Sequence, residues 1–196
     1  MTERPNLVAA ARTTAAVLSA ITDDALGNPT PSAGYRVADL IEHVDGLSSG
    51  LQLTARKLEV PAADIREGDG SQLRPDWRER VPGQLFDLSE AWSDPAAWEG
   101  DTVQGGIPVP AAASGMFVLN ELLVHGWELA RSTGQTYSPD PVSVDATLTF
   151  LQGFPRNDDA DRVFGPVVAV ADSAPAYDQL LGLTGRDPDW RLTATA

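Results

Sequence analysis

The fold is decided by residues 110–132, which read PAAASGMFVLNELLVHGWELARS. The apolar residues of this stretch recur at helical spacing and cover almost the whole circumference of the expected helix. They are Met116, Phe117, Val118, Leu119, Leu122, Leu123, Val124, Trp127 and Leu129. A helix that is apolar nearly all round is buried by its neighbours. We therefore expect this helix to lie at the centre of the fold, with Gly134 capping its C-terminal end.

The rest of the chain predicts further helices and little extended structure. Residues 163–170 are rich in β-branched residues and indicate an extended segment, while residues 102–109 flank Gly105-Gly106 as in a small hairpin. We therefore predict a mainly all-α fold of four substantial helices around one core, in a single domain of residues 1–196, with a small extended or β decoration near the C-terminus. The further helices are expected at residues 6–21, 37–58, 81–92 (started or kinked by Pro82), 140–152 and 175–183.

Two glycines interrupt the helix expected over residues 37–58. Gly46 and Gly50 each cost up to about 1 kcal/mol relative to alanine in a helix interior. We expect this cost to reflect the close approach of a neighbouring helix or loop.

The composition argues against several classes of protein. With 14 Lys and Arg against 28 Asp and Glu, the net charge is −14, and such a chain does not readily form the basic face that nucleic acid or an anionic membrane requires. No stretch approaches the roughly 20 apolar residues of a membrane span, so we expect a cytoplasmic protein. The absence of cysteine excludes disulfides, thiolate metal sites and a cysteine nucleophile. Thiol chemistry would therefore need an external thiol.

The two histidines of the chain both lie in strongly apolar helical stretches. Glu121 precedes His125 by four residues, which places the two side chains on one helix face, one turn apart. A carboxylate in such an apolar run is costly to bury unless its charge is compensated, and a divalent metal would compensate it. His43 could supply a third ligand across a helix–helix interface. The alternative is that both histidines are ordinary core residues.

Two histidines and one carboxylate would leave coordination positions open for water or substrate. This pattern is typical of catalytic zinc and of non-haem iron centres, and not of a closed structural site. It differs from the HExxH arrangement of zinc proteases, because the glutamate precedes the second histidine by a full turn.

Several motifs along the chain together point to a family. They are residues 43–46 (HVDG), 121–131 (ELLVHGWELAR), 133–135 (TGQ), 164–168 (FGPVV) and 183–190 (LTGRDPDW). These stretches resemble an actinobacterial metal-binding family related to the N-terminal domain of mycothiol-dependent maleylpyruvate isomerase, within the DinB-like superfamily. The resemblance covers nearly the whole chain.

The resemblance implies a DinB-like four-helix bundle that holds one divalent ion through His43, Glu121 and His125. Zinc is the usual ion, and nickel also occurs in the superfamily. The resemblance further implies mycothiol as a cosubstrate, a small-molecule electrophile as substrate, and a homodimer as one oligomeric form. Maleylpyruvate isomerase adds a C-terminal domain to its active site, and the roughly 45 residues after the helix at 140–152 are too few to replace it.

Three functions fit these observations. The leading one is a thiol-dependent transferase or isomerase that acts on a small electrophile. A non-catalytic metal- or ligand-binding stress-response bundle is the second, and a hydrolase that uses a metal-bound water is the third. An open coordination position beside a pocket would favour catalysis, whereas a fourth protein ligand would favour a structural metal.

Other residues near these motifs have more specific expectations. Asp45 and Asn120 are candidates to accept hydrogen bonds from the metal-binding histidines. Gly126 is expected to allow close helix packing, and Arg131 to stack on Trp127 at a helix surface. Arg186 lies in a turn closed by Gly185 and Pro188, and we expect it to form salt bridges that fix the C-terminal segment.

Overall fold

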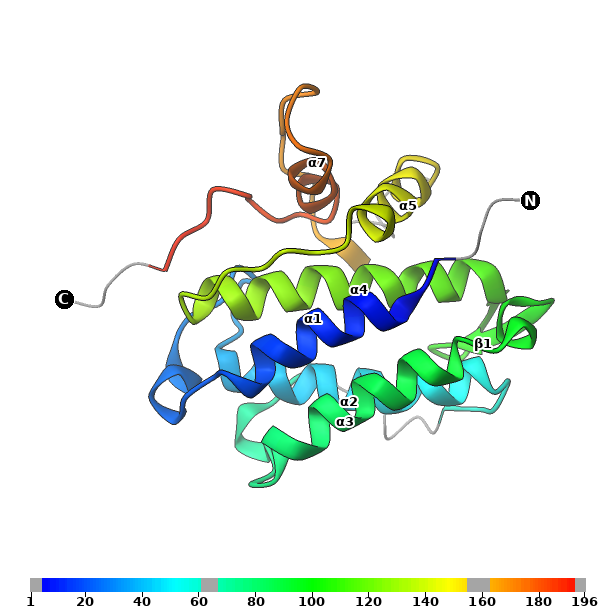
Figure 1. Cartoon of the computed structure of the whole chain (residues 1–196), viewed down its shortest axis with the longest axis horizontal. Coiled ribbons are helices and arrows are strands. Elements are labelled where there is room, and N and C mark those ends of the chain that lie inside the picture. Colours follow the sequence, from blue (N-terminus) through cyan, green and yellow to red (C-terminus); the bar gives the residue numbers. More distant parts are fainter. Residues whose placement is uncertain (1–4, 61–66, 155–162, 193–196) are drawn as a thin grey trace.

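Four helices of the computed structural model, which describes residues 5–60, 67–154 and 163–192, form a bundle. They are α1 (Leu7–Ser19), α2 (Val37–Ala55), α3 (Trp77–Ala91) and α4 (Ala111–Ser132) (Figure 1). Helices α1 and α2 each pack against both α3 and α4, so the apolar stripes of all four face one core. This arrangement confirms the predicted mainly all-α fold class.

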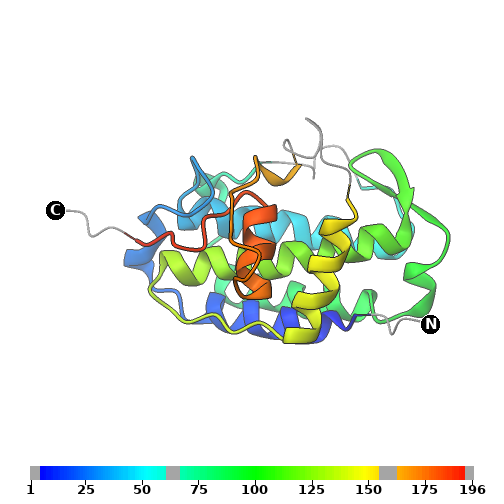
Figure 2. The ribbon, with the colours of Figure 1, turned by 90° about the horizontal axis from the view of Figure 1, so that it is seen from above.

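Helix α4 is the central element, as its sequence predicts. The C-terminal helices α5 (Pro141–Gln152) and α7 (Ala176–Leu183) lie across α4 on the side opposite α2 and α3 (Figures 1 and 2). Leu119, Leu123 and Leu129 are consequently fully buried. Gly134 follows the helix with a φ of 69°, the left-handed conformation expected after a C-terminus.

The third helix begins earlier than its apolar spacing predicts. Trp77 lies one turn before Val81 and shares its buried face, so the helix starts there and Pro82 falls inside it. Helix α2 ends at Ala55, three residues before the predicted Leu58, whose side chain is exposed. Short 3-10 helices occur in the connections, at Asp23–Gly27, Gly70–Gln72 and Pro95–Trp98.

The extended structure lies before α4 and not near the C-terminus. Strands β1 (Asp101–Gln104) and β2 (Ile107–Pro110) form the predicted hairpin, in which Gly105 and Gly106 both have positive φ. Residues 163–170, for which the sequence predicts an extended segment, form no paired strand within the described ranges. Residues 163 and 164 are helical, and Gly165 and Pro166 end the helix. Residues 167–170 follow as a single segment that pairs with no strand of the described chain.

None of the helices within the described ranges has the length and apolar character needed to cross a membrane.

Gly126 provides a test of the packing between α1 and α4. A β-carbon at this position would collide with the hydroxyl of Thr14 on α1 and with the ring of Tyr137, which confirms the expected helix packing. We expect Gly126→Ala to lower the free energy of unfolding by about 1–3 kcal/mol, because the added methyl overpacks the contact. The measurement is urea denaturation.

Gly83→Ala is the matched control for that substitution. Gly83 is exposed in the middle of α3, and a β-carbon there would have no described neighbour within 4 Å. Helix propensity alone should then stabilise the variant by up to about 1 kcal/mol. Equal effects of the two alanines would contradict the packing role of Gly126.

Candidate metal centre

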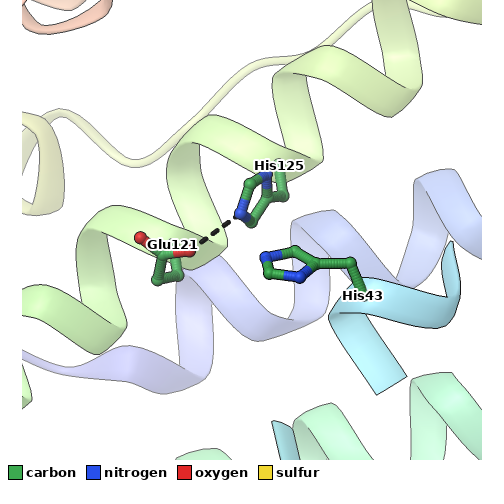
Figure 3. A group of neighbouring side chains, drawn as sticks. All are labelled: His43, Glu121 and His125. Carbon is green, nitrogen blue, oxygen red and sulfur yellow. Dashed lines mark hydrogen bonds and ion pairs between the residues drawn. The ribbon is translucent and has the colours of Figure 1, made fainter. Parts of the chain in front are cut away.

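The structure brings the three predicted ligands together between α2 and α4. Helix α4 carries Glu121 and His125 one turn apart, and α2 carries His43 opposite them (Figure 3). One ligand atom from each residue lies within 4.8 Å of the other two. Glu121 Oε2 is 2.8 Å from His125 Nε2. Among the described residues, this is the group of acidic and histidine side chains close enough to share one ion.

His43 has the protonation state that a ligand requires. Burial, followed by the charge of nearby His125, lowers the pKa of His43 to about 4, so its imidazole is neutral and has a free lone pair. The two histidine rings meet edge to face with 5.0 Å between their centroids. Nδ1 of His43 is buried without a hydrogen-bond partner in the described part of the chain. The other ring nitrogen, Nε2, is the one that faces Glu121 and His125 in Figure 3 and is the candidate ligand atom.

His125 is held by carboxylates on both sides. Its Nδ1 lies 2.7 Å from Glu128 Oε2, while its Nε2 faces Glu121. Burial opposes a charge on the ring, but Glu121 and then Glu128 outweigh burial and raise the pKa of His125 to about 9. Without an ion, His125 is therefore a cation between two carboxylates. A divalent ion can take the place of the Nε2 proton while Glu128 still accepts from Nδ1.

Glu128 is the important residue that sequence reasoning missed. Its side chain is fully buried, and Arg186 Nε donates to its Oε1 at 2.9 Å. Burial raises the pKa of Glu128, but Arg186 and His125 outweigh burial and lower that pKa to about 2. Ser32 donates a further hydrogen bond of 2.8 Å. The available signal was its spacing, three residues after His125 in an apolar helix.

The expectations for the surrounding residues have mixed outcomes. The prediction for Asp45 was wrong, because this carboxylate turns toward α3 and forms an ion pair of 2.7 Å with Arg80. Asn120 contacts the site through Glu121, to which its side-chain nitrogen donates at 3.4 Å, and Glu128 is the acceptor for His125 in its place.

The contacts predicted for Arg186 and Arg131 are both present. Arg186 lies in the predicted salt bridge and ties the C-terminal segment to α4. Arg131 stacks over Trp127 at 5.5 Å from the ring centroid. Trp127 itself is buried, so this stack is not the surface feature that was expected.

A cavity of about 330 Å³ opens beside the three candidate ligands. Tyr35, just before α2, and Phe117 of α4 form part of its wall, and Phe164 and Arg186 of the C-terminal segment form another part. An ion bound at this place would therefore face a cavity large enough for small molecules, as catalytic metal sites do.

Comparison with known proteins gives two kinds of relative. Uncharacterized proteins of two Mycobacterium tuberculosis strains, CDC 1551 / Oshkosh among them, are each 27% identical to this chain over 177 residues, covering 88% of it and 91% of the relative. The crystal structure of the mycothiol-dependent maleylpyruvate isomerase matches with a TM-score of 0.58 at 22% identity. A histidine-to-alanine mutant of that enzyme matches with a TM-score of 0.57 at 20% identity.

The structural match shows a shared fold. It covers 74% of this chain but only 66% of the isomerase chain. A family model, the mycothiol maleylpyruvate isomerase N-terminal domain, matches residues 7–130, which comprise all four bundle helices except the last residues of α4. This chain therefore belongs to the mycothiol maleylpyruvate isomerase N-terminal domain family.

Proposed function

We propose that this protein binds one divalent metal ion through His43, Glu121 and His125 and uses it in thiol-dependent transfer or isomerisation of a small electrophile. Zinc is the expected ion, with nickel as the alternative. The observation that carries the proposal is the gathering of these three ligand atoms within 4.8 Å beside a cavity. Family membership supports mycothiol as the thiol.

The charges around the site favour an anionic partner such as a thiolate. The buried charged groups are the carboxylates of Glu121 and Glu128 and the guanidinium of Arg186, with His125 neutral once it is a ligand. With a divalent ion added, these groups have a net charge of +1 in a poorly solvated site. A single thiolate neutralises it, which lowers the cost of burying both charges.

A divalent ion held here would act as a Lewis acid that lowers the pKa of a bound thiol. The residues of the chain position the reaction. Glu128 fixes the ring of His125, and Phe117 and Phe164 limit water in the cavity. In a transfer, sulfur bonds to the electrophilic carbon and the leaving group departs with its electron pair. In an isomerisation, sulfur adds to a double bond, the carbon–carbon bond rotates, and sulfur leaves again.

Cobalt-substituted protein provides the test of this function. Adding mycothiol to the cobalt-loaded wild type should produce the near-ultraviolet absorption of cobalt–thiolate charge transfer, because soft thiolate ligands bind directly to such an ion. The same titration with Glu121→Gln should give no such band. A cobalt spectrum of the wild type that mycothiol leaves unchanged would remove thiol chemistry and favour a site that activates water.

A further inference from the structure

A second cavity of about 210 Å³ borders the metal site along α2. It shares His43, Leu47 and Phe117 with the cavity that contains the candidate ligands, so the two spaces adjoin at these side chains. From there it extends past Gly46 and Gly50 toward the β1–β2 hairpin. No Asp, Glu, Lys or Arg occurs among the described residues that line it. The cavity is therefore an apolar extension of the site.

Within the described part of the chain, no packing contact requires glycine at position 46. It lies in the middle of α2, where glycine costs up to about 1 kcal/mol relative to alanine. A β-carbon at Gly46 would meet no atom of the described residues within 4 Å, so the expected close neighbour is not among them. At Gly50 a β-carbon would lie 3.4 Å from a methyl of Val60, so a neighbour is present at that position. The missing side chain of Gly46 thus keeps volume open beside His43.

The charged groups of the two cavities also restrict what can bind. Arg186 is the one cationic Lys or Arg side chain among the described residues lining either cavity, and it is already paired with Glu128. A carboxylate placed in the apolar cavity would lose its hydration without gaining a partner. An uncharged group has no such cost.

We propose that this apolar cavity binds an uncharged apolar group, about the size of a substituted benzene ring, of the molecule on which the metal site acts. A dry apolar cavity of about 150 Å³ is enough to bind benzene, so the volume here accommodates a ring with a small substituent. The inference rests on the proposed function, because it names the substrate class for that site.

Fluorine NMR with fluorobenzene as the probe tests the proposal. With the metal removed by EDTA, fluorobenzene should bind the wild type in a saturable way, and fluorobenzoate should bind more weakly because its carboxylate gains no charged partner in the apolar cavity. Gly46→Leu should weaken fluorobenzene binding by about tenfold or more, because the leucine side chain would occupy part of the cavity. Preventing the burial of only two CH₂-sized groups of the probe costs about that factor. Gly83→Leu is the matched control, because it adds the same side chain to an exposed position of α3 and should change nothing.

The position of the bound probe is a separate readout. In cobalt-loaded protein, the fluorine signal of bound fluorobenzene should broaden relative to zinc-loaded protein, because His43 borders both the ion and the cavity. Unchanged binding in Gly46→Leu, tighter binding of fluorobenzoate than of fluorobenzene to the metal-free protein, or no broadening by cobalt would each overturn the proposal.

The design also separates this inference from the proposed function. His125 does not line the apolar cavity, so His125→Ala should lose the metal but still bind fluorobenzene. Fluorobenzene binding without any thiol chemistry would leave the apolar cavity established as a binding site and overturn its link to the substrate. Thiol chemistry without fluorobenzene binding would overturn the cavity inference and leave the metal function intact.

Discussion

The wild-type protein, purified without a histidine tag, is expected to contain one equivalent of zinc or nickel, and Glu121→Gln and His125→Ala are expected to contain none. Each substitution removes one of the three proposed ligands, and no other histidine or carboxylate of the described residues belongs to this group. Elemental mass spectrometry of the purified proteins measures the metal directly.

Asp45→Asn is the matched control for these variants. Asp45 is two residues from His43 on α2, but its carboxylate pairs with Arg80, so this variant should retain the metal. Stability gives a second readout. Zinc at about 100 times its dissociation constant should raise the free energy of unfolding of the wild type by about 2.7 kcal/mol, and it should leave Glu121→Gln unchanged. Folded wild type that takes up no zinc would make both histidines core residues.

The parts of the site that the sequence predicts are those that depend on local spacing. Glu121 and His125 face the same way because they are four residues apart on one helix. His43 could be placed opposite them because its helix has an apolar stripe that must face the core. The central position of α4 follows from its apolar circumference in the same way.

The parts that the sequence did not predict depend on contacts between distant segments. Arg186 meets Glu128 across 58 residues of sequence, and no local pattern specifies that contact. Residues 163–170 have strand propensity, but a strand needs a pairing partner, and the described chain offers none there. Glycine in a helix interior indicates close packing at Gly46, but the described residues leave the space beside it open. In each case the outcome is decided by tertiary neighbours and not by the residue itself.

Removing the carboxylate of Glu128 should have the largest effect on stability. Glu128→Ala leaves Arg186 and His125 without their shared buried partner, and breaking a buried ion pair from one side costs about 3–5 kcal/mol. Urea denaturation in the presence of EDTA measures this cost without any contribution from bound metal. Glu128→Gln, which keeps the shape of the side chain but not its charge, should weaken zinc binding about 10- to 100-fold, because His125 is then less firmly oriented.

A double-mutant cycle identifies the pair as the cause. Arg186→Met alone leaves the carboxylate of Glu128 buried with His125 and Ser32, and should also destabilise the protein. Combining Glu128→Gln with Arg186→Met removes both charges together, so the double variant should lose less stability than the two single variants added, by about 1 kcal/mol or more.

The exposed pair of Arg74 and Asp76 is the matched control for the cycle. These side chains are 60% and 52% exposed and lie 3.0 Å apart, so solvent screens their interaction and Asp76→Asn should leave the free energy of unfolding nearly unchanged. Additive effects at Glu128 and Arg186 would contradict the buried pair. Coupling of the two would show that the C-terminal segment, which lies beyond the residues matched by the family model, stabilises the carboxylate that holds His125, a proposed ligand.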